Sequence, residues 1–461
     1  MRARLMGSRH RWGMGPWPTV LFLTTLFFIT NQGLNFGSGQ VVVPTAQEIA
    51  ESTAGSGSLE KQISMVALAA FGLTVLLGQR GTRPKVNGAL GWLILSFLVW
   101  AFASLAWADD KIIASKRLCI LAAFCLGALA VNKSFSLRDI VRFSLFSCST
   151  TLLLGFLVEV AHGEFQPFQE GYRFCGMIHP NPQGWNCALL FLSGIALGRT
   201  GEKGRRFFLA CGLVGFVFLI LTRSRGAWAA ALLSLVMLWS AGWTRARKLV
   251  ACYIAALAFV LALLVTGDAL YPALRKAILL GRDDESTETL NGRVRLWDEA
   301  FSYASRRPIQ GYGYDSFWTP QHELDISEAV GWGVGAAHNG YLDLVLGVGL
   351  VGAAIYVSIL LLSIARSLLL FRRHRNGLVG FALAVLVFYA LVMSIDGIAM
   401  GPTIPTFVVF LLLLKLGFRM EEPRLHMLAR NGNSTSVASQ SFRAGHGEPE
   451  PRGHFGFQRP I

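Results

Sequence analysis

Four polar residues of this sequence have types and surroundings that could carry out chemistry. Arg223 and Arg225 stand between two apolar runs, Arg293 lies in a long polar stretch, and His338 directly precedes another apolar run. A guanidinium group binds two phosphate oxygens at once, and a neutral imidazole accepts a proton near neutral pH. Together these residues predict a site that holds a phosphate group and removes a proton.

Each of these interpretations has a purely structural alternative. An arginine at a membrane surface can extend to lipid headgroups without binding any substrate, and His338 can be an interfacial histidine with no chemical role. The partial positive charge at a helix N-terminus would favour the neutral, proton-accepting imidazole. The residues alone leave both alternatives open.

Weaker candidates for contact with a sugar or an acceptor lie near the same stretches. They are Asn339, Tyr341, Trp297 and Tyr312, and the same region holds Tyr314, Trp318 and Trp332. Aromatic rings pack against sugar faces, although they are also common wherever a chain meets the membrane surface.

No metal and no cofactor is predicted. The seven cysteines include no CxxC pair and no cluster with histidines at ligand spacing. The acidic run at 281–285 is interpreted as an exposed loop. Gly311–Gly313 lacks the strand and helix that a dinucleotide site requires, and no ATPase phosphate loop occurs, so ATP hydrolysis is not expected.

The composition places these residues in a membrane protein. Of the 461 residues, 53% are hydrophobic and 15% are charged, against roughly 25% charged in an ordinary soluble domain. A soluble protein of this size could not hide so much apolar surface, whereas a bilayer is itself an apolar solvent. The net charge of +15 is attributed to basic cytoplasmic loops and not to nucleic-acid binding.

We therefore predict an all-α fold, a polytopic bundle of about 12 transmembrane helices, because each span requires about 20 mostly apolar residues. Suitable runs occur at 17–31, 62–78, 88–107, 117–131, 138–161, 183–198, 206–222, 226–243, 247–266, 340–364, 377–395 and 403–419.

Positive charges predict the orientation of this bundle, because Lys and Arg concentrate in cytoplasmic loops. Both termini are predicted to be cytoplasmic. The resulting segments are a basic N-terminus at 1–16, spans at 17–266, an external loop at 267–339, spans at 340–419 and a disordered tail at 420–461. Arg223, Arg225 and the cations of the external loop break the charge rule, which indicates that they have a function.

The external loop is predicted to contain an amphipathic helix lying across the outer mouth of the bundle. Asn291 is a candidate N-cap, and the helix is expected to run to about Ser305. Its apolar face is predicted from residues at helical spacing, namely Val294, Trp297, Phe301 and Ala304. Pro308 ends the helix, and Gly311 and Gly313 make the next segment turn sharply. The alternative is a helix that only rests on the lipid surface.

Over roughly residues 90–415, the chain resembles the O-antigen ligase and polymerase superfamily of bacterial envelope proteins. Four stretches carry the resemblance: Trp107–Asp110 followed by Lys116–Arg117; Ser224–Gly226; Gly292–Arg293 with Trp297, Pro308 and Gly311–Gly313; and His338–Asn339 with Gly349 and Gly352. The last two stretches, correctly spaced on one long external loop, are the most specific.

The resemblance implies a metal-independent, inverting glycosyltransferase with twelve spans. Such enzymes take a glycan from an undecaprenyl-pyrophosphate carrier on the outer side of the bacterial cytoplasmic membrane. Carried over by motif, Arg225 and Arg293 would hold the pyrophosphate, and His338 would be the base for the acceptor hydroxyl. Arg223 duplicates the charge beside Arg225, so which of the two binds is open.

Three functions remain possible from the resemblance. A polymerase would pass the glycan to another lipid-linked repeat, a ligase would pass it to lipid A-core, and a transporter would move lipid-linked sugar without chemistry. General similarity to exopolysaccharide-production members, including Trp107–Asp110, favours polymerisation of an exopolysaccharide or O-antigen repeat. The implied partners are the lipid-linked donor, a glycan or lipid A-core acceptor, membrane lipids and a chain-length or export protein.

Overall fold

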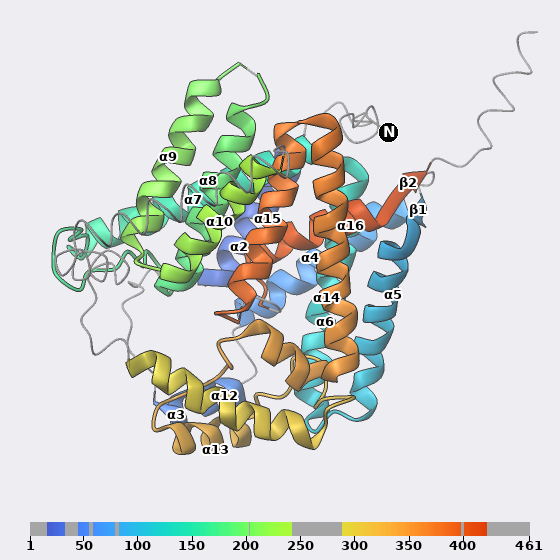
Figure 1. Cartoon of the computed structure of the whole chain (residues 1–461), viewed down its shortest axis with the longest axis vertical. Coiled ribbons are helices and arrows are strands. Elements are labelled where there is room, and N and C mark those ends of the chain that lie inside the picture. The colour runs from blue at the N-terminus through green and yellow to red at the C-terminus, as the bar shows by residue number, and fades with distance from the viewer. Residues whose placement is uncertain are drawn as a thin grey trace, which may run out of the picture.

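The structure is a computed structural model that describes residues 16–32, 45–54, 59–78, 83–201, 203–241, 288–397 and 401–421. It is mostly helical (Figure 1). The predicted ninth span at 247–266, the first part of the loop 267–339 and residues 422–461 of the predicted disordered tail lie outside the described residues. The first two residues of that tail, 420 and 421, are not disordered but end a strand.

Helices occupy eleven of the twelve ranges that were predicted to span the membrane, the ninth being outside the described residues. They are α2 (Trp17–Gln32), α4 (Leu59–Gly78), α5 (Gly88–Ala103), α6 (Lys111–Ser134), α7 (Leu137–Ala161), α8 (Pro180–Gly198), α9 (Arg205–Leu221), α10 (Arg225–Ser240), α14 (Gly340–His374), α15 (Gly377–Met393) and α16 (Ile404–Gly417). Within the described residues five of these are long and apolar enough to cross a bilayer, namely α4, α5 with its 3-10 extension (Ser104–Ala106), α6, α7 and α14. The total number of spans stays a prediction.

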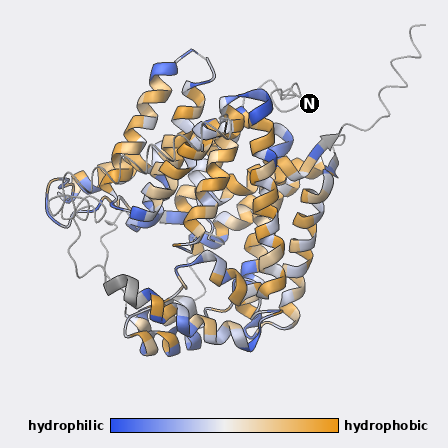
Figure 2. Ribbon diagram, viewed as in Figure 1, coloured by the Kyte–Doolittle hydropathy of each residue, from blue (hydrophilic) through white to orange (hydrophobic). Residues whose placement is uncertain are grey.

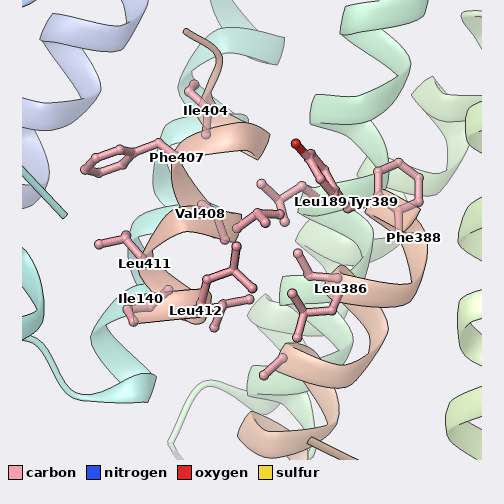
Figure 3. Close-up of a cluster of buried hydrophobic side chains, with 14 of the residues drawn as sticks. Ile140, Leu189, Leu386, Phe388, Tyr389, Ile404, Phe407, Val408, Leu411 and Leu412 are labelled. Atoms are coloured by element: carbon pink, nitrogen blue, oxygen red, sulfur yellow. The ribbon is translucent and has the colours of Figure 1, made fainter. Parts of the chain in front are cut away.

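Burial separates central helices from those suited to face lipid. In α15 and α16 almost every residue is buried, and Tyr389 and Phe407 lie in the cluster where both helices meet α7 and α8 (Figure 3). By contrast, α5 and α9 expose large apolar side chains such as Trp92 and Phe207, and the helices are apolar along most of their length (Figure 2). A helix that is apolar on all sides packs inside a bundle. A helix with an exposed apolar face is suited to contact with lipid.

Three further helices gather at one end of the bundle (Figure 1): α3 (Ala46–Ala54), α12 (Glu288–Arg306) and α13 (Pro320–Val330). Helices α12 and α13 share a second apolar core with the segment that precedes α14, and α3 packs against α13. The buried members of this core include Leu296, Ile326, Val334 and Ala337. The segment leading to His338 is therefore packed and not a free loop.

The amphipathic helix of the external loop is confirmed as α12, but its start and its buried face differ from the prediction. Asn291 lies inside the helix, so its assignment as N-cap was wrong. Of the predicted apolar face, Ala304 is buried and Trp297 packs against the second core as predicted, but Val294 and Phe301 are exposed. Leu296 and Ala300 are buried in their place, because the helix packs against α13 and α14 with that face.

Helix α14 contains a break at Gly349, whose backbone is not helical (φ 67°, ψ −177°). The segment after α12 fills this break. Leu350 donates its backbone N–H to the carbonyl oxygen of Pro308 at 2.7 Å, and Gly313 donates to that of Gly347 at 2.8 Å. Irregular backbone inside a membrane protein requires such partners, so the break and the segment depend on each other.

The motif between α5 and α6 holds the same segment from the other side. Asp109 forms an ion pair with Arg307 at 2.6 Å, and Arg117 approaches Asp315 at 3.4 Å. The indole N–H of Trp107 donates to the carbonyl oxygen of Gln310 at 3.0 Å. Trp107, Asp109 and Arg117 belong to one of the less specific stretches of the family resemblance. In the structure they fix the segment that carries Gly311 and Gly313.

A two-stranded sheet is present that the all-α prediction did not include. β1 (Arg83–Val86) pairs antiparallel with β2 (Phe418–Glu421), and the pair joins the beginning of α5 to the end of α16. Each strand has four residues, which is too short for a strand periodicity to be recognised in the sequence.

Gly349→Ala is expected to destabilise the protein by on the order of 3 kcal/mol or more. An added Cβ would overlap the carbonyl oxygen of Ile309 and lie 2.6 Å from the nitrogen of Gln310. Gly163→Ala is the matched control, because Gly163 has a similar φ of +71° with open space around it, and it should cost only about 1–2 kcal/mol. Thermal unfolding in detergent measures both. Equal losses would mean that the segment after α12 contributes nothing at this break.

Candidate active site

The stretches predicted to carry chemistry come together around the turn that follows α15. Arg293 of α12 donates a hydrogen bond from Nη1 to the carbonyl oxygen of Ile395 at 3.0 Å. Gly226, in the first turn of α10, lies so close that an added Cβ would overlap the Ile395 side chain. Nδ1 of His338 lies 3.5 Å from Oδ1 of Asp396. One turn thus contacts segments from α10, α12 and the start of α14.

Arg223 and Arg225 form a cationic junction between α9 and α10. Arg223 has a left-handed backbone (φ 47°), and Arg225 is the first residue of α10. Both side chains are partly exposed, and within the described part of the chain neither has a carboxylate partner. Unpaired guanidinium groups and the N–H groups of a helix N-terminus favour a bound anion. The junction is therefore suited to a phosphate group.

His338 lies at the edge of the bundle with its ring oriented by a carboxylate. Its backbone is left-handed (φ 48°), and its side chain is 34% exposed. Burial opposes ionisation of Asp396, but the hydrogen bond and charge of His338, the N–H of Gly397 and the guanidinium of Arg293 together lower the pKa of this carboxyl. The neutral tautomer that carries its proton on Nδ1 would direct that proton to Asp396 and leave Nε2 as the proton acceptor.

Two polar residues that the sequence analysis did not select complete this network. Asn181, at the start of α8, donates from Nδ2 to Oδ2 of Asp396 at 3.2 Å. Arg173 donates from Nη2 to Oδ1 of Asn181 at 3.0 Å and from Nε to the carbonyl oxygen of Thr222 at 3.1 Å. Arg173 therefore connects the carboxylate beside His338 to the junction that carries Arg223 and Arg225.

A buried carboxylate at the end of α7 fixes the segment that bears Arg173. Glu159 is 2% exposed and accepts the backbone N–H groups of Cys175 at 2.8 Å and Gly176 at 2.7 Å. The hydroxyl of Tyr172 donates to the same side chain at 2.5 Å. With these donors on both sides of position 173, the arginine is held in place by its neighbours.

Two of the predicted contact residues build the start of α14. Asn339 is its N-cap, and the side-chain oxygen accepts the N–H of Tyr341 at 3.1 Å and that of Leu342 at 3.3 Å. Tyr341 donates its hydroxyl to the carbonyl oxygen of Ala390 at 2.8 Å. Both residues lie next to His338, and these hydrogen bonds of the Asn339 amide oxygen and the Tyr341 hydroxyl stabilise the fold.

The other two predicted contact residues behave differently. Trp297 donates its indole N–H to the carbonyl oxygen of Ala337 at 2.9 Å, which fixes the residue before His338. Tyr312 is 5% exposed and donates its hydroxyl to the carbonyl oxygen of Tyr303 at 2.9 Å. The structure does not bring Tyr312 to the turn after α15, and its ring packs inside the second core.

The arrangement combines cations that can neutralise a phosphate with a histidine that lies beside a carboxylate. Residues 210–357 match the family model described as O-antigen ligase, a range that contains Arg223, Arg225, Arg293 and His338. The chain is also 23% identical over 360 residues to the exopolysaccharide production protein ExoQ of Rhizobium meliloti (strain 1021), a match that covers 73% of this chain and 79% of that protein.

The two matches support a relationship to the O-antigen ligase and polymerase superfamily. Together with the apolar helices they support a multi-pass membrane protein of ligase or polymerase type. Asp396, which approaches His338, and Asn181, which donates to Asp396, lie outside the matched range 210–357.

Proposed function

We propose that this protein is a glycosyltransferase that polymerises undecaprenyl-pyrophosphate-linked glycan on the outer side of the bacterial cytoplasmic membrane, producing an exopolysaccharide or an O-antigen. The observation that carries the proposal is the meeting of the Arg225–Gly226 junction, Arg293 and His338 at the turn after α15. These residues supply cations for a pyrophosphate and a base for a hydroxyl, which a transfer from a pyrophosphate donor requires.

The proposed reaction is a single displacement at the anomeric carbon of the donor glycan. The acceptor hydroxyl forms the new glycosidic bond while the bond from that carbon to the pyrophosphate oxygen breaks, and undecaprenyl pyrophosphate leaves with the electron pair. Nε2 of His338 takes the hydroxyl proton, and the carboxylate of Asp396 stabilises the imidazolium. Arg225 or Arg223, together with Arg293, neutralises the leaving group. One displacement inverts the configuration and needs neither a metal ion nor a carboxylate pair.

Similarity to an exopolysaccharide production protein supports polymerisation, while the description of the family model supports the alternative of ligation to lipid A-core. A ligase would use the same donor and the same base. A transporter of lipid-linked sugar would need the cations but no base, and the carboxylate-oriented histidine therefore supports an enzyme.

The test is a transfer assay on the purified protein in proteoliposomes, with the undecaprenyl-pyrophosphate-linked repeat unit of the producing bacterium as donor. A ladder of longer lipid-linked glycans formed from the donor alone supports the polymerase, because the donor then serves as its own acceptor. Product that requires added lipid A-core supports the ligase. Movement of unchanged donor across the membrane, with no new glycosidic bond, would support the transporter and reject the enzyme.

The proposed location predicts opposite accessibility at two positions. In a variant with the exposed Cys119 replaced by Ser, Ile309→Cys should react with a membrane-impermeant thiol reagent applied outside, and Arg373→Cys should not. Ile309 lies beside Gly349, and the 24 steps from residue 349 to residue 373 of α14 span about 36 Å at 1.5 Å per residue. The hydrocarbon core is about 30 Å thick, so the two labels lie on opposite sides. Labelling of Ile309→Cys only after the membrane is opened would reject an external site.

A further inference from the structure

The indole of Trp332 lies beside the proposed base His338 and has no role in the reaction proposed so far. The indole of Trp332 and the imidazole of His338 are stacked, with ring centroids 6.0 Å apart and planes inclined by 24°. The centroid distance is within the 4.5–7 Å range of interacting aromatic pairs. Trp332 is partly exposed, so the pair lies at the open edge of the site and not in the core.

The position of Trp332 is fixed by the segment that carries it. Gly331 ends α13 with a left-handed backbone (φ 84°) and donates its N–H to the carbonyl oxygen of Ser327 at 2.8 Å. Val334 is completely buried and donates its N–H to Oγ of Ser327 at 2.9 Å. Trp332 stands between these two anchored residues and packs against the second core. The indole is thus a fixed surface for the imidazole to lie against.

The imidazole has two independent constraints. Oδ1 of Asp396 lies 3.5 Å from Nδ1, and this contact selects which edge of the imidazole faces the carboxylate. Trp332 covers one face, which selects the plane of the ring. With the Nδ1 edge and one face occupied, Nε2 is the nitrogen left for the acceptor hydroxyl. At 3.5 Å this contact is at the long limit for a hydrogen bond, so it is too weak to hold the ring plane by itself.

We infer that Trp332 is a positioning residue that holds the plane of the His338 imidazole and stabilises the imidazolium formed during transfer. The inference rests on the proposed function, because it requires His338 to take a proton. The negative face of an indole attracts a cation, so the stacked pair is stronger after the proton has moved than before. An interaction that strengthens toward the transition state raises kcat and leaves substrate affinity unchanged.

The test compares Trp332→Leu, which removes the ring, with Trp332→Phe, which keeps a smaller one. In the proteoliposome transfer assay, Trp332→Leu should lower kcat about five- to tenfold with KM unchanged, the size expected for one aromatic pair. Trp332→Phe should recover most of the loss. Trp92→Leu is the matched control, because Trp92 is an exposed indole on α5, and it should transfer glycan normally.

The double variant with His338→Gln decides whether Trp332 acts through the histidine. Once the imidazole is absent, Trp332→Leu should lower the residual rate less than twofold. An equal loss in both backgrounds, an unchanged kcat in Trp332→Leu, or a raised KM with normal kcat would each overturn the inference. Failure of the proposed function is seen separately, because the unsubstituted protein would then form no new glycosidic bond from the lipid-linked donor in the same assay.

Discussion

His338→Gln is expected to lower glycan transfer by about 10²-fold or more, the usual contribution of a positioned general base. Glutamine preserves a polar side chain of similar reach but cannot take a proton. The site is at the edge of the bundle, with the side chain 34% exposed, so folding and insertion should survive. Binding of undecaprenyl pyrophosphate, measured by native mass spectrometry of the detergent-purified protein, should also survive because the arginines provide it.

His162→Gln is the matched control for this variant. His162 is an exposed histidine that follows α7, with its Nδ1 near the carbonyl oxygen of Val158 at 3.0 Å, and it has no contact with the turn after α15 among the described residues. This variant should transfer at the normal rate. Near-normal transfer by His338→Gln would reduce the histidine to a positioning group. Loss of pyrophosphate binding would instead place it in the phosphate site.

Hydropathy was sufficient to locate the helices but not their irregularities. The run from Gly340 onward predicted one continuous span, whereas α14 breaks at Gly349 and runs to His374. Gly347, Gly349 and Gly352 are visible in the sequence, but glycine is tolerated in ordinary membrane helices too. What makes Gly349 necessary is the close approach of Ile309. That contact is tertiary, so no local sequence pattern predicts it.

In the candidate site too, some residues can be recognised from their type alone, whereas others are recognised only from their tertiary contacts. Arginines and a histidine next to apolar runs are unusual enough to be noticed from their types alone. Asp396 and Asn181 are ordinary residues for the ends of helices, and Arg173 is a single arginine in the segment between α7 and α8. The signal that was available is that Asp396 is an acidic residue directly after an apolar span, but its partner His338 is remote in sequence.

Arg293→Ala is expected to lower glycan transfer by about 10²-fold, the usual cost of removing one group that stabilises developing charge. Its effect should differ from that of His338→Gln, because binding of undecaprenyl pyrophosphate should weaken as well. Arg225→Ala should show the same two losses, since the junction carries the other cations. Arg293→Lys should remain impaired, because an ammonium group keeps the charge but loses the planar fork that binds two oxygens.

The control for Arg293 lies two residues further along the same helix. Arg295 is exposed and lies outside the turn network, so Arg295→Ala should bind and transfer normally. Because Arg293 also donates to the carbonyl oxygen of Ile395, its removal can loosen the turn that carries Asp396. Binding separates the two effects: weak pyrophosphate binding assigns Arg293 to the donor, and normal binding with slow transfer assigns it to holding the turn. Full activity of Arg293→Ala would remove Arg293 from the site.

The same assay also distinguishes the two arginines of the junction. Comparing Arg223→Ala with Arg225→Ala identifies which of them binds phosphate.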